Sequence, residues 1–161
     1  MNNCVSISYI SSSYLELTRT CHQSCGYCSF YRDDANLLSL DEIKKRVADL
    51  AKRNATEVIF ISGEQPQDFP HIQIALHKNG FASYGDYLLA ACNVALEANL
   101  LPVLEVGYLD SFTWEKFSAA GCSARINLVS AALASSGEAL ENSRGRNPSS
   151  GRACIEAAHA A

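Results

Sequence analysis

Thr56-Glu-Val-Ile-Phe-Ile-Ser-Gly63 is the stretch of sequence that decides the fold. Residues 58–61 form a continuous apolar run between polar flanks, a pattern typical of a strand that is buried on both faces of a parallel sheet. Similar β-prone runs precede it at residues 13–18 and follow it at residues 102–106 and 124–128. The sequence therefore predicts four strands.

Helical patterns separate these strands. A capping box at Ser39-Leu-Asp-Glu42 begins one amphipathic helix, and Ser83 is the expected N-cap of a second helix that runs to Asn99. We expect a third helix over residues 112–117 and a weak helix from about residue 152 to the end.

The segment between the second strand and the second helix is predicted to be a loop, because it carries Pro66, Pro70 and Gly80. The remaining order is βαβαβαβ, which predicts an α/β fold. The right-handed crossover rule then makes the sheet parallel, with the helices outside it. We expect a single domain over residues 1–161, with a divergent tail over 131–161.

The overall composition excludes several classes of function. The chain has 161 residues, of which 48% are hydrophobic and 19% charged, and its formal net charge is -4. Its basic residues are scattered, so they offer no patch for nucleic acid, and no apolar run approaches the roughly 20 residues that span a bilayer. We expect no nucleic-acid or membrane partner and a cytoplasmic location.

Three of the seven cysteines lie in one short loop after the first predicted strand, Cys21-His-Gln-Ser-Cys25-Gly-Tyr-Cys28. The C-x3-C-x2-C spacing lets three thiolates point toward a common centre. Three ligands leave one iron of a four-iron cluster without a protein ligand, so a small molecule can bind there. The alternatives are a zinc site and a set of buried free cysteines. Structural zinc normally takes four protein ligands, and His22 lies too close to Cys21 to be a ready fourth.

The other four cysteines are isolated in the sequence: Cys4, Cys92, Cys122 and Cys154. Cys92 shares a helix face with Leu88 and Ala95, so we expect it in the core. We expect each of the four to be a small buried side chain in preference to a metal ligand.

The cysteine loop, with Tyr27 directly before its last cysteine, resembles the signature of the radical S-adenosylmethionine (radical SAM) superfamily. Ser62-Gly-Glu64 is similar to that superfamily's Gly-Gly-Glu stretch, whose main chain binds the amino group of the methionine part of the cofactor. The resemblance implies these roles: Cys21, Cys25 and Cys28 as ligands of a 4Fe-4S cluster, Tyr27 packed over it, and Ser62, Gly63 and Glu64 as the seat of S-adenosylmethionine. A solvated turn is the alternative for Glu64.

Longer segments narrow the resemblance to the 7,8-didemethyl-8-hydroxy-5-deazariboflavin synthase family, and within it to the cyclising subunit or domain. They are residues 14–21, 25–30, 57–66, 80–84 and 96–102. In that family the reduced cluster splits S-adenosylmethionine, and the 5′-deoxyadenosyl radical abstracts a hydrogen. The substrate is a hydroxybenzyl adduct of 5-amino-6-ribitylaminouracil, and its cyclisation gives the 5-deazaflavin chromophore.

The same resemblance implies partners for the chain. A partner radical SAM subunit makes the substrate, and a ferredoxin or flavodoxin is the expected reductant. Three alternatives stay open: another radical SAM enzyme of the biotin synthase or menaquinone-pathway type, a non-catalytic iron–sulfur or zinc-binding module, and a flavodoxin-like domain with incidental cysteines.

The chain departs from the family in two strands and in length. After Pro102 the family has His-Thr-Asn-Leu-Gly, where this chain has Val103-Leu-Glu-Val-Gly107, and the fourth-strand segment at residues 127–135 lacks the family's closing glutamate. A full (β/α)8 barrel takes about 250 residues. We therefore expect a partial, truncated radical SAM barrel, its N-terminal half, with about four parallel strands and outer helices.

Overall fold

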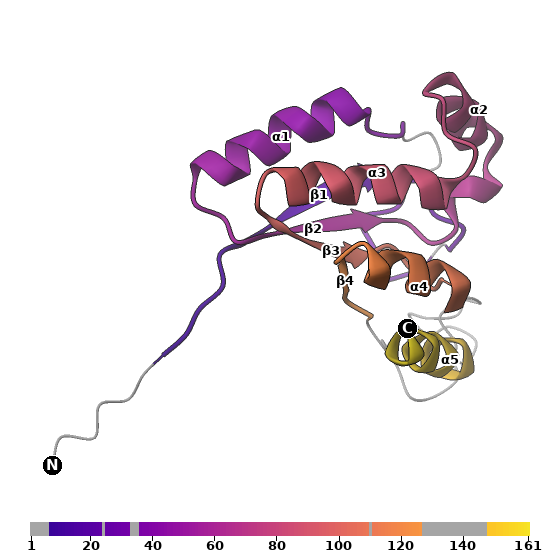
Figure 1. Ribbon diagram of the computed structural model, residues 1–161. Helices are drawn as coiled ribbons and strands as arrows, with labels where there is room; N and C mark the ends of the chain where they lie inside the picture. The colour runs from indigo at the N-terminus through magenta and orange to yellow at the C-terminus, as the bar shows by residue number, and fades with distance from the viewer. Residues whose placement is uncertain (1–6, 24, 33–35, 110, 127–147) are drawn as a thin grey trace, which may run out of the picture.

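A computed structural model of the chain describes residues 7–23, 25–32, 36–109, 111–126 and 148–161 (Figure 1). Four parallel strands form one sheet in the order β1-β2-β3-β4. The strands are β1 (Ser12–Thr18), β2 (Glu57–Ser62), β3 (Leu101–Glu105) and β4 (Ser123–Ala124). The predicted α/β class and the parallel four-stranded sheet are confirmed.

Helices connect successive strands, and a further helix follows β4. They are α1 (Leu40–Lys52), the 3-10 turn η1 (Pro66–Asp68), α2 (Pro70–Lys78), α3 (Tyr84–Glu97), α4 (Ser111–Ala119) and α5 (Pro148–Ala160). Figure 1 shows α1 and α3 side by side over one face of the sheet and α5 beside α4. The prediction of helices outside a parallel sheet is therefore confirmed for the described elements.

Two of the helices begin at the predicted caps. The Glu42 N–H donates to Ser39 Oγ at 3.3 Å while Glu42 Oε2 accepts from the Ser39 N–H at 3.4 Å, which completes the capping box of α1. Ser83 Oγ accepts from the Asp86 N–H at 3.1 Å at the start of α3. These side chains satisfy backbone donors that a helix leaves open in its first turn.

Side chains alternate between the two faces of the sheet. Leu15, Phe60 and Leu104 pair across β1, β2 and β3, and all three are buried in the core beneath the helices. One position further along, Glu16, Ile61 and Glu105 pair in the same way on the opposite face. The core therefore lies on the helical side of the sheet, and the other face carries polar groups.

The predicted loop around Pro70 is wrong, because this segment forms η1 and α2. Pro70 occupies the first position of α2, where a helix tolerates a missing N–H and uses the fixed φ of proline. Gly80 follows the helix with φ +80°, a left-handed conformation that glycine adopts readily. The two residues thus mark the limits of a helix.

Boundaries near the C-terminus also differ from the prediction. The fourth strand was expected at residues 124–128, but β4 is Ser123–Ala124, and residues 127 and 128 lie outside the described part of the chain. Helix α5 begins at Pro148 and not near residue 152. The segment 127–135 that was compared with the family's fourth strand is also outside the described residues. Within the described ranges, no helix is long and apolar enough to cross a bilayer.

Candidate cluster and cofactor site

The three cysteines of the predicted cluster loop lie between β1 and α1. Cys21 and Cys25 are partly buried, Cys28 is exposed, and all three thiols are free. The Cys28 N–H donates to the Cys25 carbonyl at 3.0 Å and closes a tight turn between them. No group of three or more His, Cys, Asp or Glu side chains in the described ranges is arranged to hold a metal ion. The structure thus keeps the thiols on one loop without a formed ligand sphere.

Cys21 has the most developed surroundings of the three cysteines. Its Sγ accepts from the Glu64 N–H at 3.1 Å and from the Gln23 N–H at 3.4 Å. Burial raises the pKa of the Cys21 thiol above its ordinary value, and these two amide hydrogen bonds act in the opposite direction. Hydrogen bonds of this kind to cysteine sulfur tune iron–sulfur clusters in proteins.

Gly63 allows the end of β2 to lie directly against the cysteine loop. A Cβ at this position would be 2.5 Å from Cys21 Cβ and closer still to the Thr20 carbonyl oxygen, distances that real Cβ atoms do not show. The Gly63 N–H donates to the Thr18 carbonyl at 3.3 Å. The position therefore requires glycine because of a close backbone approach, and not because of a positive φ.

Glu64 connects the cysteine loop to the end of β3. Its carbonyl accepts from the His22 N–H at 2.8 Å, and its Oε1 accepts from the Tyr108 N–H at 2.7 Å. The residue is only 2% exposed, so the solvated-turn interpretation is wrong. Gly107, with φ +91°, makes room for the carboxylate, since a Cβ there would lie 2.7 Å from Glu64 Oε1.

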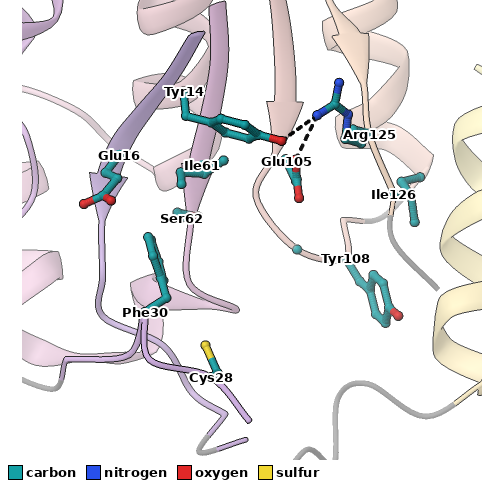
Figure 2. Close-up of a pocket in the computed structure, with 11 residues that line it drawn as sticks. Tyr14, Glu16, Cys28, Phe30, Ile61, Ser62, Glu105, Tyr108, Arg125 and Ile126 are labelled. Carbon is teal, nitrogen blue, oxygen red and sulfur yellow. Dashed lines mark hydrogen bonds and ion pairs between the residues drawn. The ribbon is translucent and has the colours of Figure 1, made fainter. Parts of the chain in front are cut away.

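A cavity of about 560 Å³ opens on the polar face of the sheet, next to the cysteine loop (Figure 2). Its volume is in the range of small-molecule sites, roughly 300–1,000 Å³. Figure 2 shows Cys28 at one end and Tyr14 with Arg125 at the other. The lining residues are Tyr14, Glu16, Cys28, Phe30, Ile61, Ser62, Glu105, Gly107, Tyr108, Arg125 and Ile126.

Arg125 joins the outer strands of the sheet across this cavity. Its Nη1 donates to the Tyr14 hydroxyl at 2.8 Å and lies 3.7 Å from Glu105 Oε2, and its guanidinium lies over the Tyr14 ring. Sequence reasoning did not select Tyr14, Glu16 or Arg125. The available signal was the alternation of polar with apolar residues in 13–18, which places Tyr14 and Glu16 on the face opposite the core.

The predicted cofactor residues are only partly brought together. Ser62 lines the cavity, and its hydroxyl donates to the Gly63 carbonyl at 2.9 Å. Gly63 and Glu64 lie behind it, against Cys21. Tyr27 is 51% exposed and does not line the cavity. The cofactor roles of these four residues stay predictions.

The remaining described cysteines are not all isolated. Cys92 and Cys154 are buried, as expected, but Cys122 is only partly buried, and Cys4 lies outside the described residues. A hydrogen bond between the thiols of Cys92 and Cys122, with burial, raises the pKa of Cys92, and the same bond lowers the pKa of Cys122. The expectation of burial is therefore met by Cys92 and Cys154 but only in part by Cys122, which follows α4 and meets Cys92 of α3.

Comparison with known proteins gives several relatives that share one name. The 7,8-didemethyl-8-hydroxy-5-deazariboflavin synthase of Archaeoglobus fulgidus is 29% identical over 143 residues, which cover 88% of this chain and 43% of that protein. The synthase of Methanococcoides burtonii is 31% identical over 108 residues, covering 65% and 33%. That of Halobacterium salinarum is 37% identical over 100 residues, covering 60% and 27%. The chain thus spans less than half the length of these relatives.

Solved structures share the fold. The X-ray structure of the FeFe-hydrogenase maturase HydG from Carboxydothermus hydrogenoformans matches 92% of this chain and 33% of its own chain, with a TM-score of 0.68 and 16% identity. The family model of the radical SAM superfamily matches residues 15–103, which hold the second half of β1, the cysteine loop and the end of β2 with Gly63 and Glu64. The chain therefore belongs to the radical SAM superfamily.

Proposed function

We propose that this chain is the cluster- and cofactor-binding part of a radical SAM enzyme of deazaflavin biosynthesis. The observation that carries the proposal is a convergence: the cysteine loop, the β2 end at Ser62 and the β3 end at Gly107 meet beside one cavity of about 560 Å³. Sites in parallel α/β folds collect at these C-terminal strand ends. The names of the relatives favour the formation of 7,8-didemethyl-8-hydroxy-5-deazariboflavin among radical SAM reactions.

The donor chemistry fits a 4Fe-4S cluster held by Cys21, Cys25 and Cys28. All three are free thiols on one loop, and two backbone amides already donate to the first of them. Thiolate is the ligand that iron–sulfur clusters prefer. When bound, such a cluster supplies the electron that splits S-adenosylmethionine. The chain's own contribution is to hold the loop and to leave one side of it open to the cavity, where Cys28 lies.

The cavity residues would bind and orient small molecules. Ser62 presents a hydroxyl, and Glu16 and Glu105 present carboxylates that accept hydrogen bonds from hydroxyl or ammonium groups. Arg125 is held between Glu105 and Tyr14, and its positive charge offsets that of one of the two carboxylates. We propose that S-adenosylmethionine lies on the Cys28 and Ser62 side.

The substrate and protein partners of the proposed reaction follow from the family. The substrate would be the hydroxybenzyl adduct of 5-amino-6-ribitylaminouracil, supplied by a partner radical SAM subunit. A low-potential ferredoxin or flavodoxin would reduce the cluster. Because an exposed cluster is oxygen-sensitive, we propose a reducing cytoplasmic setting, which the free state of all six described cysteines suits.

Anaerobic iron and sulfide reconstitution, followed by electron paramagnetic resonance of the reduced protein, tests the first step. We expect a four-iron signal that shifts when S-adenosylmethionine is added, that disappears in Cys25→Ser, and that persists in the control Cys154→Ala. A cluster signal that ignores the cofactor would favour a non-catalytic module. Product analysis with the ribitylaminouracil adduct then separates deazaflavin formation from the reactions of other radical SAM enzymes.

A further inference from the structure

The η1–α2 segment is tied to the cysteine loop by two side-chain contacts that flank Cys21. Thr20 Oγ1 and His71 Nε2 are hydrogen-bonded at 3.0 Å, and His22 Nδ1 and Asp68 Oδ2 are also 3.0 Å apart. Both distances are within normal hydrogen-bond range. The residues on either side of Cys21 are therefore both held by the η1–α2 segment.

The two contacts differ in burial. Thr20 is fully buried, whereas the His22 and Asp68 side chains are 55% and 46% exposed. Exposed ion pairs contribute little, because water screens them and ordering both side chains costs entropy. We therefore expect the contact between Thr20 and His71 to dominate.

Phe69 fills the space between the two imidazoles. Its ring lies 6.0 Å from that of His22 in an edge-on arrangement and 5.8 Å from that of His71. Phe69 is also the residue that ends η1 and precedes α2. Phe69 thus contacts both hydrogen-bonding imidazoles where the η1–α2 segment meets the cysteine loop.

Cys21, which lies between Thr20 and His22, accepts a hydrogen bond at its Sγ from the Glu64 N–H at 3.1 Å. We propose that the η1–α2 segment is a positioning element for the cluster loop: His71 of α2 through Thr20, and Asp68 of η1 through His22, fix Cys21 where it can serve as an iron ligand. The inference rests on the proposed cluster role of Cys21 and assigns a function to a helix that neither touches the cavity nor carries a predicted ligand. Metal ligands must be placed to within about 0.2 Å, and residues behind the ligands typically change metal affinity by about 10–100-fold.

A double-mutant cycle on the reconstituted chain tests the dominant contact. The variants are His71→Ala, Thr20→Val and the pair together, and the readout is the rate at which a chelator removes iron. We expect each single variant to lose iron about tenfold faster and the pair to lose it no faster than either, because one interaction is removed in all three. His71→Gln, whose amide nitrogen reaches the place of Nε2, should restore the slow rate. The control is His77→Ala, an exposed histidine on the same helix.

Thiol alkylation of the metal-free chain tests the positioning without the cluster. Releasing the loop exposes Cys21, so we expect its alkylation to be several-fold faster in His71→Ala than in His77→Ala, with Cys28 unchanged since it is already exposed. Asp68→Ala should raise the rate of Cys21 alkylation less than His71→Ala does, and Asp68→Asn should raise it less than Asp68→Ala. Asp41→Ala, the control at an exposed aspartate, should leave the rate unchanged. Circular dichroism identifies any variant that does not fold. If Thr20→Val does not fold, Thr20→Ser tests the same hydroxyl by keeping it, and its iron loss should stay as slow as that of the wild type.

The outcomes separate this inference from the proposed function. Equal iron loss and equal alkylation in His71→Ala and His77→Ala would overturn the role of α2 while leaving the cluster in place. A wild-type chain that takes up no four-iron cluster would overturn the proposed function and the role of α2 as support for a ligand. A tenfold effect that His71→Gln reverses would establish the inference.

Discussion

Gly63→Ala probes the closest backbone contact of the site. The added Cβ would lie 2.5 Å from Cys21 Cβ, and real Cβ atoms stay at least 3.0 Å apart, so Cys21 must retreat by at least about 0.5 Å. That displacement exceeds the tolerance of about 0.2 Å for metal ligands. Because the other close atoms are backbone atoms of Thr20 and Cys21, rotating a side chain cannot relieve the overlap.

We expect Gly63→Ala to lower the free energy of unfolding by about 1–3 kcal/mol and cluster affinity by about 10–100-fold. Urea unfolding measures the first quantity, and iron content after anaerobic reconstitution measures the second. The matched control is Gly85→Ala in the first turn of α3, where the nearest atom to a new Cβ is Ser83 Oγ at an ordinary 3.6 Å. Equal iron content and equal stability in the two variants would refute the close-approach argument.

Three further predictions concern the supporting structure. Gly107→Ala should lower the free energy of unfolding by about 2 kcal/mol, and Gly80→Ala by about 1 kcal/mol. Both glycines have a positive φ, but only a Cβ at position 107 would crowd the Glu64 carboxylate. Equal midpoints of urea unfolding for the two variants would contradict this reasoning. At neutral pH, Cys122, whose pKa is lowered, should be alkylated about tenfold faster than the buried Cys92. Peptide mass spectrometry measures both rates, and faster alkylation of Cys92 would contradict the prediction. Tyr87→Phe removes a 2.7 Å hydrogen bond to the Leu38 carbonyl and should cost about 1 kcal/mol in urea unfolding, whereas Tyr9→Phe, at an exposed residue, should cost nothing.

Local patterns predicted the elements whose signals are themselves local. The capping box of Ser39 with Glu42, the N-cap Ser83 and the apolar run at residues 58–61 each place a helix or strand correctly. Pro70 misled the prediction, because a proline marks either a loop or the first turn of a helix, and only the following residues distinguish the two. In α2 the apolar residues do not all share one buried face, since Ile74 is exposed while Ile72 and Leu76 are buried.

The site was less predictable because its contacts are long-range. The burial of Glu64 depends on Cys21 and Tyr108, which are 43 and 44 positions away in the sequence. Arg125 meets Tyr14 across 111 positions. The cysteine spacing indicated the loop's chemistry, but it carried no information on α2 or on the polar wall of the cavity. Those features come from strand register and packing, which one sequence does not specify directly.

Because Glu64 contacts residues far from it in the sequence, its hydrogen bonds form in a fixed order during synthesis. All three cysteines of the loop have been synthesised once the ribosome passes residue 28. The N–H that donates to Cys21 Sγ belongs to Glu64, and the N–H that donates to the Glu64 carboxylate belongs to Tyr108, so both are synthesised later. Contacts of such separation form late in folding, because the intervening chain must first be ordered. The nascent chain therefore carries three uncovered thiols while β2 and β3 emerge and join β1 in the sheet. Thiols in that state are open to oxidation until the contacts of Glu64 have formed.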